Sequence, residues 1–235
     1  MKGDYPQRAM VIMAHPDDTE DFCGGTPALW ARAGSDITAV LVTSGEKECK
    51  DPTSSPAQVM VLREQEHHAA SKLLGVRRTV FLREPDGEVL PTLALRRRIL
   101  AEVRRYKPDV VVIPDPTRYY FDNSYINHAD HRATGEATLP AVSPGANNRS
   151  YFPELLAQGL EPHCVQEIWL AIPTEPNRFV DITGTLETKI AAFLCHDSQV
   201  TDPAQVRDRI TCSTASTDAN GQVCYREAFR VMVIG

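Results

Sequence analysis

Residues that could carry chemistry gather in the stretch AHPDDTED, residues 14–21. It holds one histidine and four carboxylates. Like charges this close repel one another, so the stretch is unfavourable unless a cation or hydrogen-bond donors compensate for it. Capping of the next helix would explain a single aspartate, such as Asp17 or Asp18. Because capping does not explain His15 and Glu20 as well, the stretch predicts a metal or ligand site.

A second group of such residues lies in NHADHRATGEA, residues 127–137. A short H-x-D-H motif is weak evidence alone, because a single helical histidine is more often structural than a ligand. Together with His15 and Asp18, however, His131 would complete a set of two histidines and one carboxylate. Such a set suits a catalytic zinc ion, which leaves a position open for water. The cation would also offset the charge of HPDD.

Short apolar strands alternate with amphipathic helices along the chain. Strands are expected at 8–15, 36–45, 78–82, 109–116, 166–172 and 178–183. Helices are expected at 24–34, 55–76, 90–108, 128–142 and 185–196. This alternation predicts an α/β fold whose parallel sheet has helices on both faces.

Both polar groups follow predicted strands, at the carboxyl edge of the sheet where ligands bind in open α/β folds. The first strand–helix turn reads FCGGT and lacks the G-x-G-x-x-G of a dinucleotide site. The turn-rich stretch 143–162 is expected to be a packed surface loop. With no repeat and no domain boundary in the pattern, residues 1–235 are expected to form one domain.

Composition excludes several broad classes. The chain has 235 residues, a net charge of −6 and 42% hydrophobic residues, enough for one sizeable core. An acidic balance argues against nucleic-acid binding and against anionic lipid. No apolar run approaches the roughly 18 residues of a membrane span, and the first residues do not read as a signal peptide. The six cysteines are scattered, so reduced thiols and a cytoplasmic location are expected.

The two polar motifs together resemble the LmbE-like (PIG-L) N-acetylglucosaminyl deacetylase family. The resemblance extends over most of the chain, through LVTSGE, LREQEHHAASKLLGV, VVVIPDP, KIAAFLCHDSQ and YREAFR. It implies a Rossmann-like three-layer sandwich with a mostly parallel central sheet covered by helices on both faces. It also implies zinc-dependent hydrolysis of the acetamide of an N-acetylglucosamine-type sugar or sugar conjugate.

The resemblance implies roles for the residues of the first motif. His15, Asp18 and His131 match the family's zinc ligands, with one zinc ion, or another divalent transition metal, per chain. Asp17 matches its general base. Zinc lowers the pKa of bound water toward about 7, and an adjacent carboxylate can then accept the proton of that water.

Further catalytic and substrate-binding residues are implied in the same way. His128 and Asp130 match the pair assigned to oxyanion or charge-relay roles, so Asp130 is expected to orient His128. Arg63 and His196 match residues that line the site from other loops. Without the resemblance, Arg63 and Glu66 would be interpreted as an ordinary surface ion pair at helical spacing.

Two residues depart from the family pattern, and several others are expected to have ordinary structural roles. Phe22 stands where the family usually has glycine, which could reshape the floor of the pocket, and Ala129 replaces a frequent proline. His67 and His68 are expected on a solvated helix face. Tyr119 to Phe121 could stack on a pyranose ring or be part of an ordinary packed loop.

Two other functions fit the sequence less well. A metallo-β-lactamase-type phosphoesterase would require H-x-H-x-D-H, but Ile126 stands where the first histidine belongs. A non-catalytic sugar- or metal-binding module would have lost at least one reacting residue. The expected partner is therefore a small N-acetylated sugar or conjugate, with no nucleic acid and no membrane. The resemblance also implies a homo-oligomer, a trimer or hexamer. Loops 45–56, 116–126 and 143–162 are expected to select the substrate.

Overall fold

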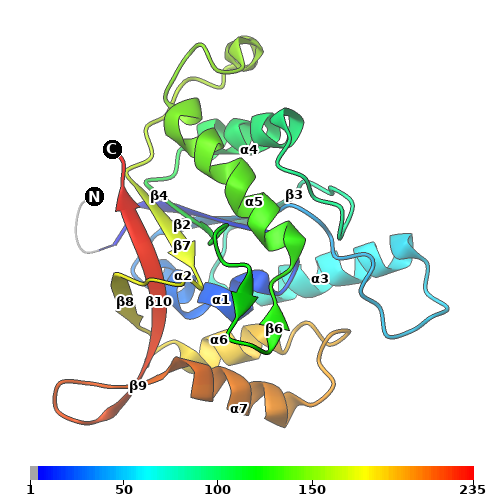
Figure 1. Cartoon of the computed structure of the whole chain (residues 1–235), viewed down its shortest axis with the longest axis vertical. Helices are drawn as coiled ribbons and strands as arrows, with labels where there is room; N and C mark the ends of the chain where they lie inside the picture. The colour runs from blue at the N-terminus through cyan, green and yellow to red at the C-terminus, as the bar shows by residue number, and fades with distance from the viewer. Residues whose placement is uncertain (1–4) are drawn as a thin grey trace.

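Buried apolar strands form the middle of the central sheet in the computed structural model, which describes residues 5–235 (Figure 1). The strand order is β3-β2-β1-β4-β7-β10-β8, and β9 pairs with β10. These strands are β1 (Arg8–Met13), β2 (Asp36–Leu41), β3 (Arg78–Phe81), β4 (Val110–Pro114), β7 (Glu167–Ala171), β8 (Arg178–Asp181), β9 (Ala215–Thr217) and β10 (Val223–Val233). Strands β3 to β7 of this order are parallel, whereas β10 is antiparallel to β7, β8 and β9.

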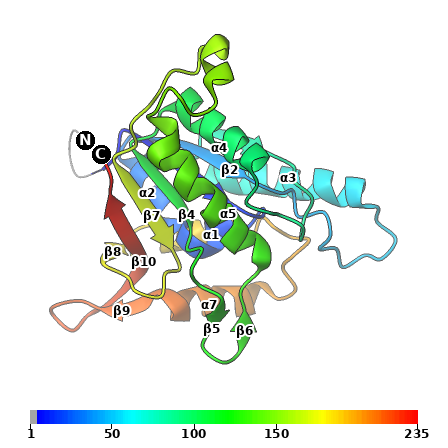
Figure 2. The ribbon, with the colours of Figure 1, turned by 45° about the horizontal axis from the view of Figure 1, so that its top comes forward.

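Helices cover both faces of this sheet, as Figures 1 and 2 show. Alternate residues of β1 point to opposite faces: Met10 and Ile12 join one apolar core with α4 and α5, while Val11 and Met13 join another with α1 and α2. The helices are α1 (Asp18–Cys23), α2 (Gly25–Arg32), α3 (Pro56–Leu74), α4 (Leu93–Tyr106), α5 (Ala129–Pro140), α6 (Leu186–Phe193) and α7 (Pro203–Thr214). The expected mostly parallel three-layer α/β fold is confirmed.

Local sequence signals fix the ends of the longest helix. Ser55 accepts a hydrogen bond from the backbone N–H of Gln58, whose side chain in turn accepts from the Ser55 N–H, which makes a capping box. Gly75 ends the helix with φ of 75°, a left-handed conformation that suits glycine. These signals fix where α3 begins and ends, and the helix packs against α2 and α6.

Several elements differ from the sequence-based expectation. Helices α1 and α7, strand β10 and the small hairpin of β5 (Tyr120–Phe121) and β6 (Tyr125–Ile126) were not expected. The residues of β10 are mostly only partly buried, as is common in antiparallel strands, whereas β1 and β4 are nearly continuous buried apolar runs. The stretch 143–162 contains part of a π-helix (Ala141–Ala146) and a 3₁₀ turn (Pro153–Gln158).

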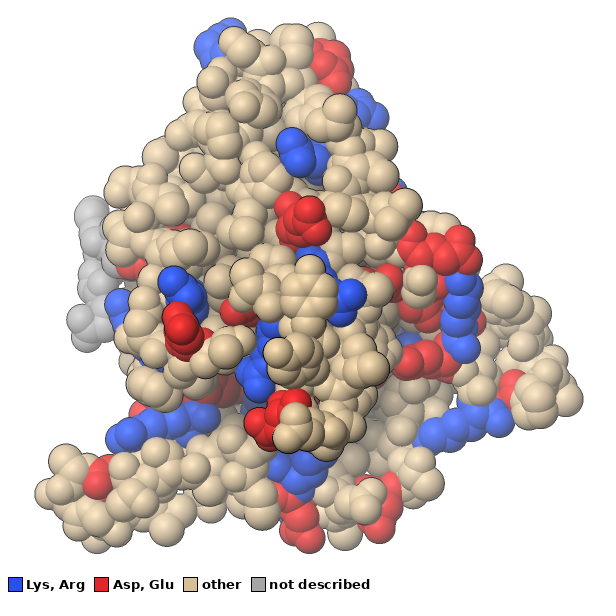
Figure 3. Space-filling view, in the orientation of Figure 1, with Lys and Arg blue, Asp and Glu red and all other residues tan. Residues whose placement is uncertain are grey.

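The surface carries both signs of charge. In Figure 3, basic and acidic side chains are interspersed over the face shown. Within the described part of the chain, every helix is too short or too polar to cross a bilayer.

Candidate metal centre and active site

Strand pairing brings the two polar motifs together. Strand β1 pairs in parallel with β2 on one side and with β4 on the other, so the chain leaves β1 at a topological switch point, where α/β folds bind ligands. The loop after β1 carries the first motif. The chain after β4 forms the β5–β6 hairpin and then α5, which begins with the second motif (Figure 2).

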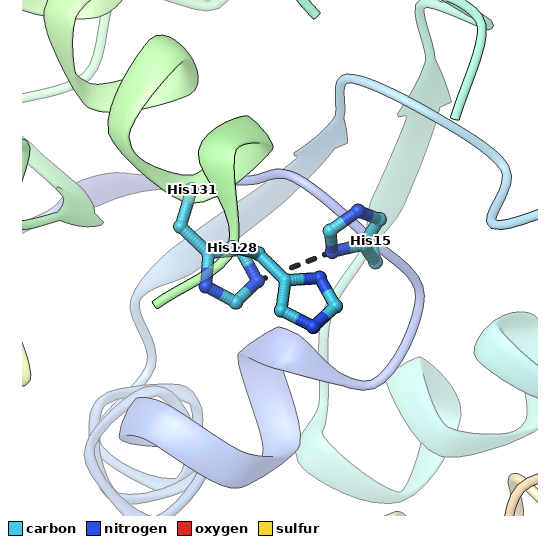
Figure 4. A group of neighbouring side chains, drawn as sticks. All are labelled: His15, His128 and His131. Atoms are coloured by element: carbon cyan, nitrogen blue, oxygen red, sulfur yellow. Dashed lines mark hydrogen bonds between the residues drawn. The ribbon is translucent and has the colours of Figure 1, made fainter. Parts of the chain in front are cut away.

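Three side chains converge at this edge. The facing nitrogens of His15 (Nδ1) and His131 (Nε2) lie 3.1 Å apart. A carboxylate oxygen of Asp18 lies 3.1 Å from His131 Nε2, and its other oxygen lies 3.5 Å from His15 Nδ1. All three residues are buried. Figure 4 shows the His15 and His131 rings approaching from the β1 loop and from α5, with His128 beside them.

The surroundings of these side chains fit a bound cation. His131 Nδ1 donates to Asn127 Oδ1 at 2.8 Å, which leaves the lone pair of Nε2 free to face His15 and Asp18. His15 Nε2 lies 3.3 Å from Asp130 and 3.2 Å from Asp86, which leaves Nδ1 for the same point. Histidine ligands of metals are oriented by such partners on the other ring nitrogen. The donor set therefore fits a divalent ion such as zinc.

Charged neighbours shift the pKa values of two of these residues, His15 and Asp18. Burial alone would lower the pKa of His15, but hydrogen bonds with Asp130, Asp18 and Asp86 outweigh it and raise that pKa well above its usual range. Burial alone would raise the pKa of Asp18, but His131 and His15 hold it well below the usual range. Asp18 also accepts hydrogen bonds from the backbone N–H groups of Ala14 and His15. Asp18 is therefore an anionic oxygen donor held in place.

The side chain of Asp17 points in a different direction from that of the adjacent Asp18. It is the residue before α1 and has φ of 102°, a conformation that non-glycine residues rarely adopt. Its Oδ2 accepts a hydrogen bond from Arg63 Nη2 at 3.0 Å, and it lines the same cavity as His15 and Asp18. Burial raises the pKa of Asp17 to about 7, although Arg63 opposes that shift. A carboxyl group with such a pKa is suited to exchange protons near neutral pH.

Asp130 was expected to orient His128, but its carboxylate contacts other residues. Its carboxylate meets His15 and accepts hydrogen bonds from the backbone N–H groups of Gly87 and Val89. His128 is the residue before α5 and Asp130 lies two positions further on, and side chains two apart on a helix do not face each other. Asp130 therefore orients His15. His128 stacks on the His131 ring instead.

Arg63 reaches the site through its hydrogen bond with Asp17, whereas neither Arg63 nor His196 lines the cavity itself. Both side chains are fully buried, so neither is on the wall of the cavity described below. Arg63 donates to the carbonyl oxygens of Pro16 and Gly45 as well as to Asp17. A Cβ on Gly45 would lie 2.2 Å from Arg63 Nη1, so only glycine allows this approach. Arg63 therefore fixes the loop that holds Asp17. It does not form the surface ion pair with Glu66 that helical spacing alone would predict.

His196 contacts Glu20, and His67 lies beside the same carboxylate. The expectation that His67 and His68 lie on a solvated face is correct for His68 but wrong for His67, which is fully buried. Positions 63, 67, 70 and 74 follow helical spacing and all face the interior.

A cavity of about 550 Å³ opens above the converging residues. Its wall includes Phe22, Phe121, Tyr125 and His128. Phe22 lies edge-on to His131, with ring centroids 5.2 Å apart, so its departure from the family pattern does shape the cavity. The volume of the cavity is within the range of small-molecule sites, and the aromatic side chains that line the cavity are typical of such sites.

Three residues of this site were not singled out from the sequence, although Tyr125 lies in loop 116–126, which was expected to select the substrate. Asn127 precedes His128 in the quoted motif, and Asp86 follows β3 at the same sheet edge, so a polar residue just after a strand was a usable signal. Tyr125 belongs to the β5–β6 hairpin, which no periodic pattern announced. The nearby Tyr119 and Tyr120 are exposed.

Replacing the partner of His131 tests whether this arrangement serves metal binding. In Asn127→Leu, His131 loses the acceptor that orients its ring, so we expect metal affinity at this site to fall by roughly 10–100-fold. Equilibrium dialysis against buffered zinc measures the change. Asn123→Leu removes an exposed asparagine of the β5–β6 hairpin, which directly precedes Asn127, and it should leave the metal affinity unchanged. Equal affinity in both variants would contradict the orienting role.

Comparison with known proteins agrees with the fold and the motifs. The family model described as PIG-L, GlcNAc-PI de-N-acetylase, matches residues 10–142. The diacetylchitobiose deacetylase of Thermococcus kodakarensis is 31% identical over 82% of this chain and 70% of its own length. A 1D-myo-inositol 2-acetamido-2-deoxy-alpha-D-glucopyranoside deacetylase of a Mycobacterium species is 27% identical over 92% of this chain and 77% of its own length. The solved N,N'-diacetylchitobiose deacetylase of Pyrococcus horikoshii superimposes with a TM-score of 0.86 at 27% identity, covering 97% of this chain and 84% of that one.

Proposed function

Since the chain belongs to the PIG-L family, we propose that it is a metal-dependent hydrolase that removes the acetyl group from an N-acetylglucosamine-type sugar or sugar conjugate. One observation carries the proposal. His15, Asp18 and His131 converge within 3.5 Å of one another, while Asp17 faces the same cavity with a pKa near neutrality. A cation site beside a proton acceptor is what amide hydrolysis by water requires.

In this proposal His15, Asp18 and His131 hold the metal. A divalent ion held there supplies a Lewis acid for the amide carbonyl and for water. Asp17 takes the proton of the attacking water on its carboxylate. Arg63 keeps that carboxylate in place through the 3.0 Å hydrogen bond. Asp17 then returns the proton to the departing amine, so that the products are a free amine and acetate.

His128 is proposed to stabilise the negative charge that develops on the carbonyl oxygen. It lines the cavity, and burial, with His131 and His15 nearby, lowers its pKa. We therefore propose that the neutral imidazole of His128 donates its N–H to this oxygen. A fixed donor aimed at a developing oxyanion is an effective form of transition-state stabilisation.

The substrate class follows from the family and from the cavity. The two named relatives act on diacetylchitobiose and on an acetamido-glucopyranoside of inositol. The wall formed by Phe121 and Tyr125 offers aromatic faces for a sugar ring.

The proposal also includes zinc as the metal, one domain over residues 1–235 and a homo-oligomer of three or six chains. A cytoplasmic location belongs to this proposal as well.

A screen for released acetate tests the proposed activity. Zinc-loaded protein is incubated with N-acetylglucosamine, N,N'-diacetylchitobiose and N-acetylglucosaminyl conjugates of inositol and malate, and acetate and free amine are measured. We expect equal amounts of both from at least one substrate. Hydrolysis of bis-p-nitrophenyl phosphate without release of acetate from any of them would instead support a phosphoesterase.

A further inference from the structure

A second group of metal-ligand side chains lies outside the cavity. Glu20 comes from α1, His67 from α3, and His196 from the turn that follows α6. All three side chains are fully buried. The proposed mechanism uses neither Glu20 nor His67, and no role in it requires His196.

The geometry of this group is compact. His196 Nε2 lies 3.3 Å from Glu20 Oε2, and His67 Nδ1 lies 3.8 Å from the same oxygen. One ligand atom from each residue lies within 4.8 Å of the other two. Ligand atoms around a tetrahedral zinc ion are separated by roughly 3.4 Å, given zinc–nitrogen distances of about 2.0–2.1 Å. Small side-chain movements would therefore bring the three atoms to coordination distance.

Polar atoms of this group lack partners. Within residues 5–235, both ring nitrogens of His67, Nδ1 of His196 and Oε1 of Glu20 are buried without a hydrogen-bond partner. Buried polar atoms in native proteins are nearly always paired, with protein, water or ion. An ion pair between His196 and Glu20 would account for the bonded atoms but would leave His67 isolated.

We propose that Glu20, His67 and His196 form a second divalent-metal site, separate from His15, Asp18 and His131. Two imidazoles and one carboxylate suit zinc or iron(II). Since all three residues are shut off from solvent, the ion is structural: it joins α1, α3 and the end of α6 and satisfies the unpaired atoms.

Metal stoichiometry tests the proposal with zinc alone as the probe. Each protein is stripped with a chelator, dialysed against buffered zinc and analysed for zinc per chain. We expect wild type to bind two ions, His67→Leu one and His131→Ala one, with neither ion bound by the double variant. His68→Leu is the matched control, because it removes the exposed neighbouring histidine of the same helix, and it should bind two.

A second measurement covers the case in which His67→Leu fails to fold. His67→Gln keeps a polar side chain of similar size, and in the His131→Ala background added zinc should raise the melting temperature of the parent but not of this variant. Binding of only one ion by wild type, or equal zinc content in wild type and His67→Leu, would overturn the second site. That result would leave the deacetylase proposal intact, because the acetate screen and the His131→Ala stoichiometry test it separately.

Discussion

Asp17→Asn is expected to keep the metal of the active site and to lower turnover by roughly 100-fold or more, as loss of a general base does. Asparagine preserves the size of the side chain and can still contact Arg63, but it cannot accept the proton of water. Asp18 and the two histidines that converge with it are unchanged. Zinc content and the rate of acetate release, measured on the same preparation, check both parts of the expectation.

Asp21→Asn provides the control for Asp17→Asn. Asp21 also lines the cavity, but it forms an ion pair with Arg209 at 2.6 Å, so its loss should have a much smaller effect on turnover. Loss of metal from Asp17→Asn would show that Asp17 is a ligand instead. Equal and modest effects of the two variants would mean that Asp17 carries no chemistry.

His131→Ala is expected to lose the active-site metal and to reduce turnover by roughly 1,000-fold or more, because the electrostatic stabilisation supplied by a metal is worth several kcal/mol. His131 Nε2 lies 3.1 Å from His15 Nδ1 and 3.1 Å from a carboxylate oxygen of Asp18. Zinc analysis should show one ion fewer than wild type, and excess zinc should not restore full activity.

His128→Ala separates the two ligand sets that the geometry permits. Nitrogens of His15, His128 and His131 also lie within 4.8 Å of one another, so His128 could in principle coordinate in place of Asp18. We expect His128→Ala to keep the metal and to lower the rate, and Asp18→Asn to weaken metal binding. The reverse result would exchange the roles of Asp18 and His128.

The positions of the polar motifs could be predicted from the sequence because they depend on topology. Strands β1 and β4 are continuous apolar runs, and such runs are typical of parallel strands buried on both faces. Parallel neighbours end at the same edge of a sheet, so His15 and His131 were expected to be close. The structure brings their nitrogens to 3.1 Å.

The partners of individual side chains could not be predicted in this way. The direction of Asp130 toward His15 depends on where the loop at Gly87 and Val89 passes, and that loop has no periodic pattern. Burial of Arg63 and His67 was missed because charged or polar residues on a helix are usually solvated. Their spacing with Ala70 and Leu74 was the available signal.

The backbone at Asp17 sets stability against activity at a single position. A non-glycine residue at φ of 102° costs about 1–3 kcal/mol, and glycine would relieve that cost while removing the carboxylate. In Asp17→Gly the relief of backbone strain therefore competes with the loss of the carboxylate that faces the buried Arg63 guanidinium, so the free energy of unfolding gains less than the strain alone would give.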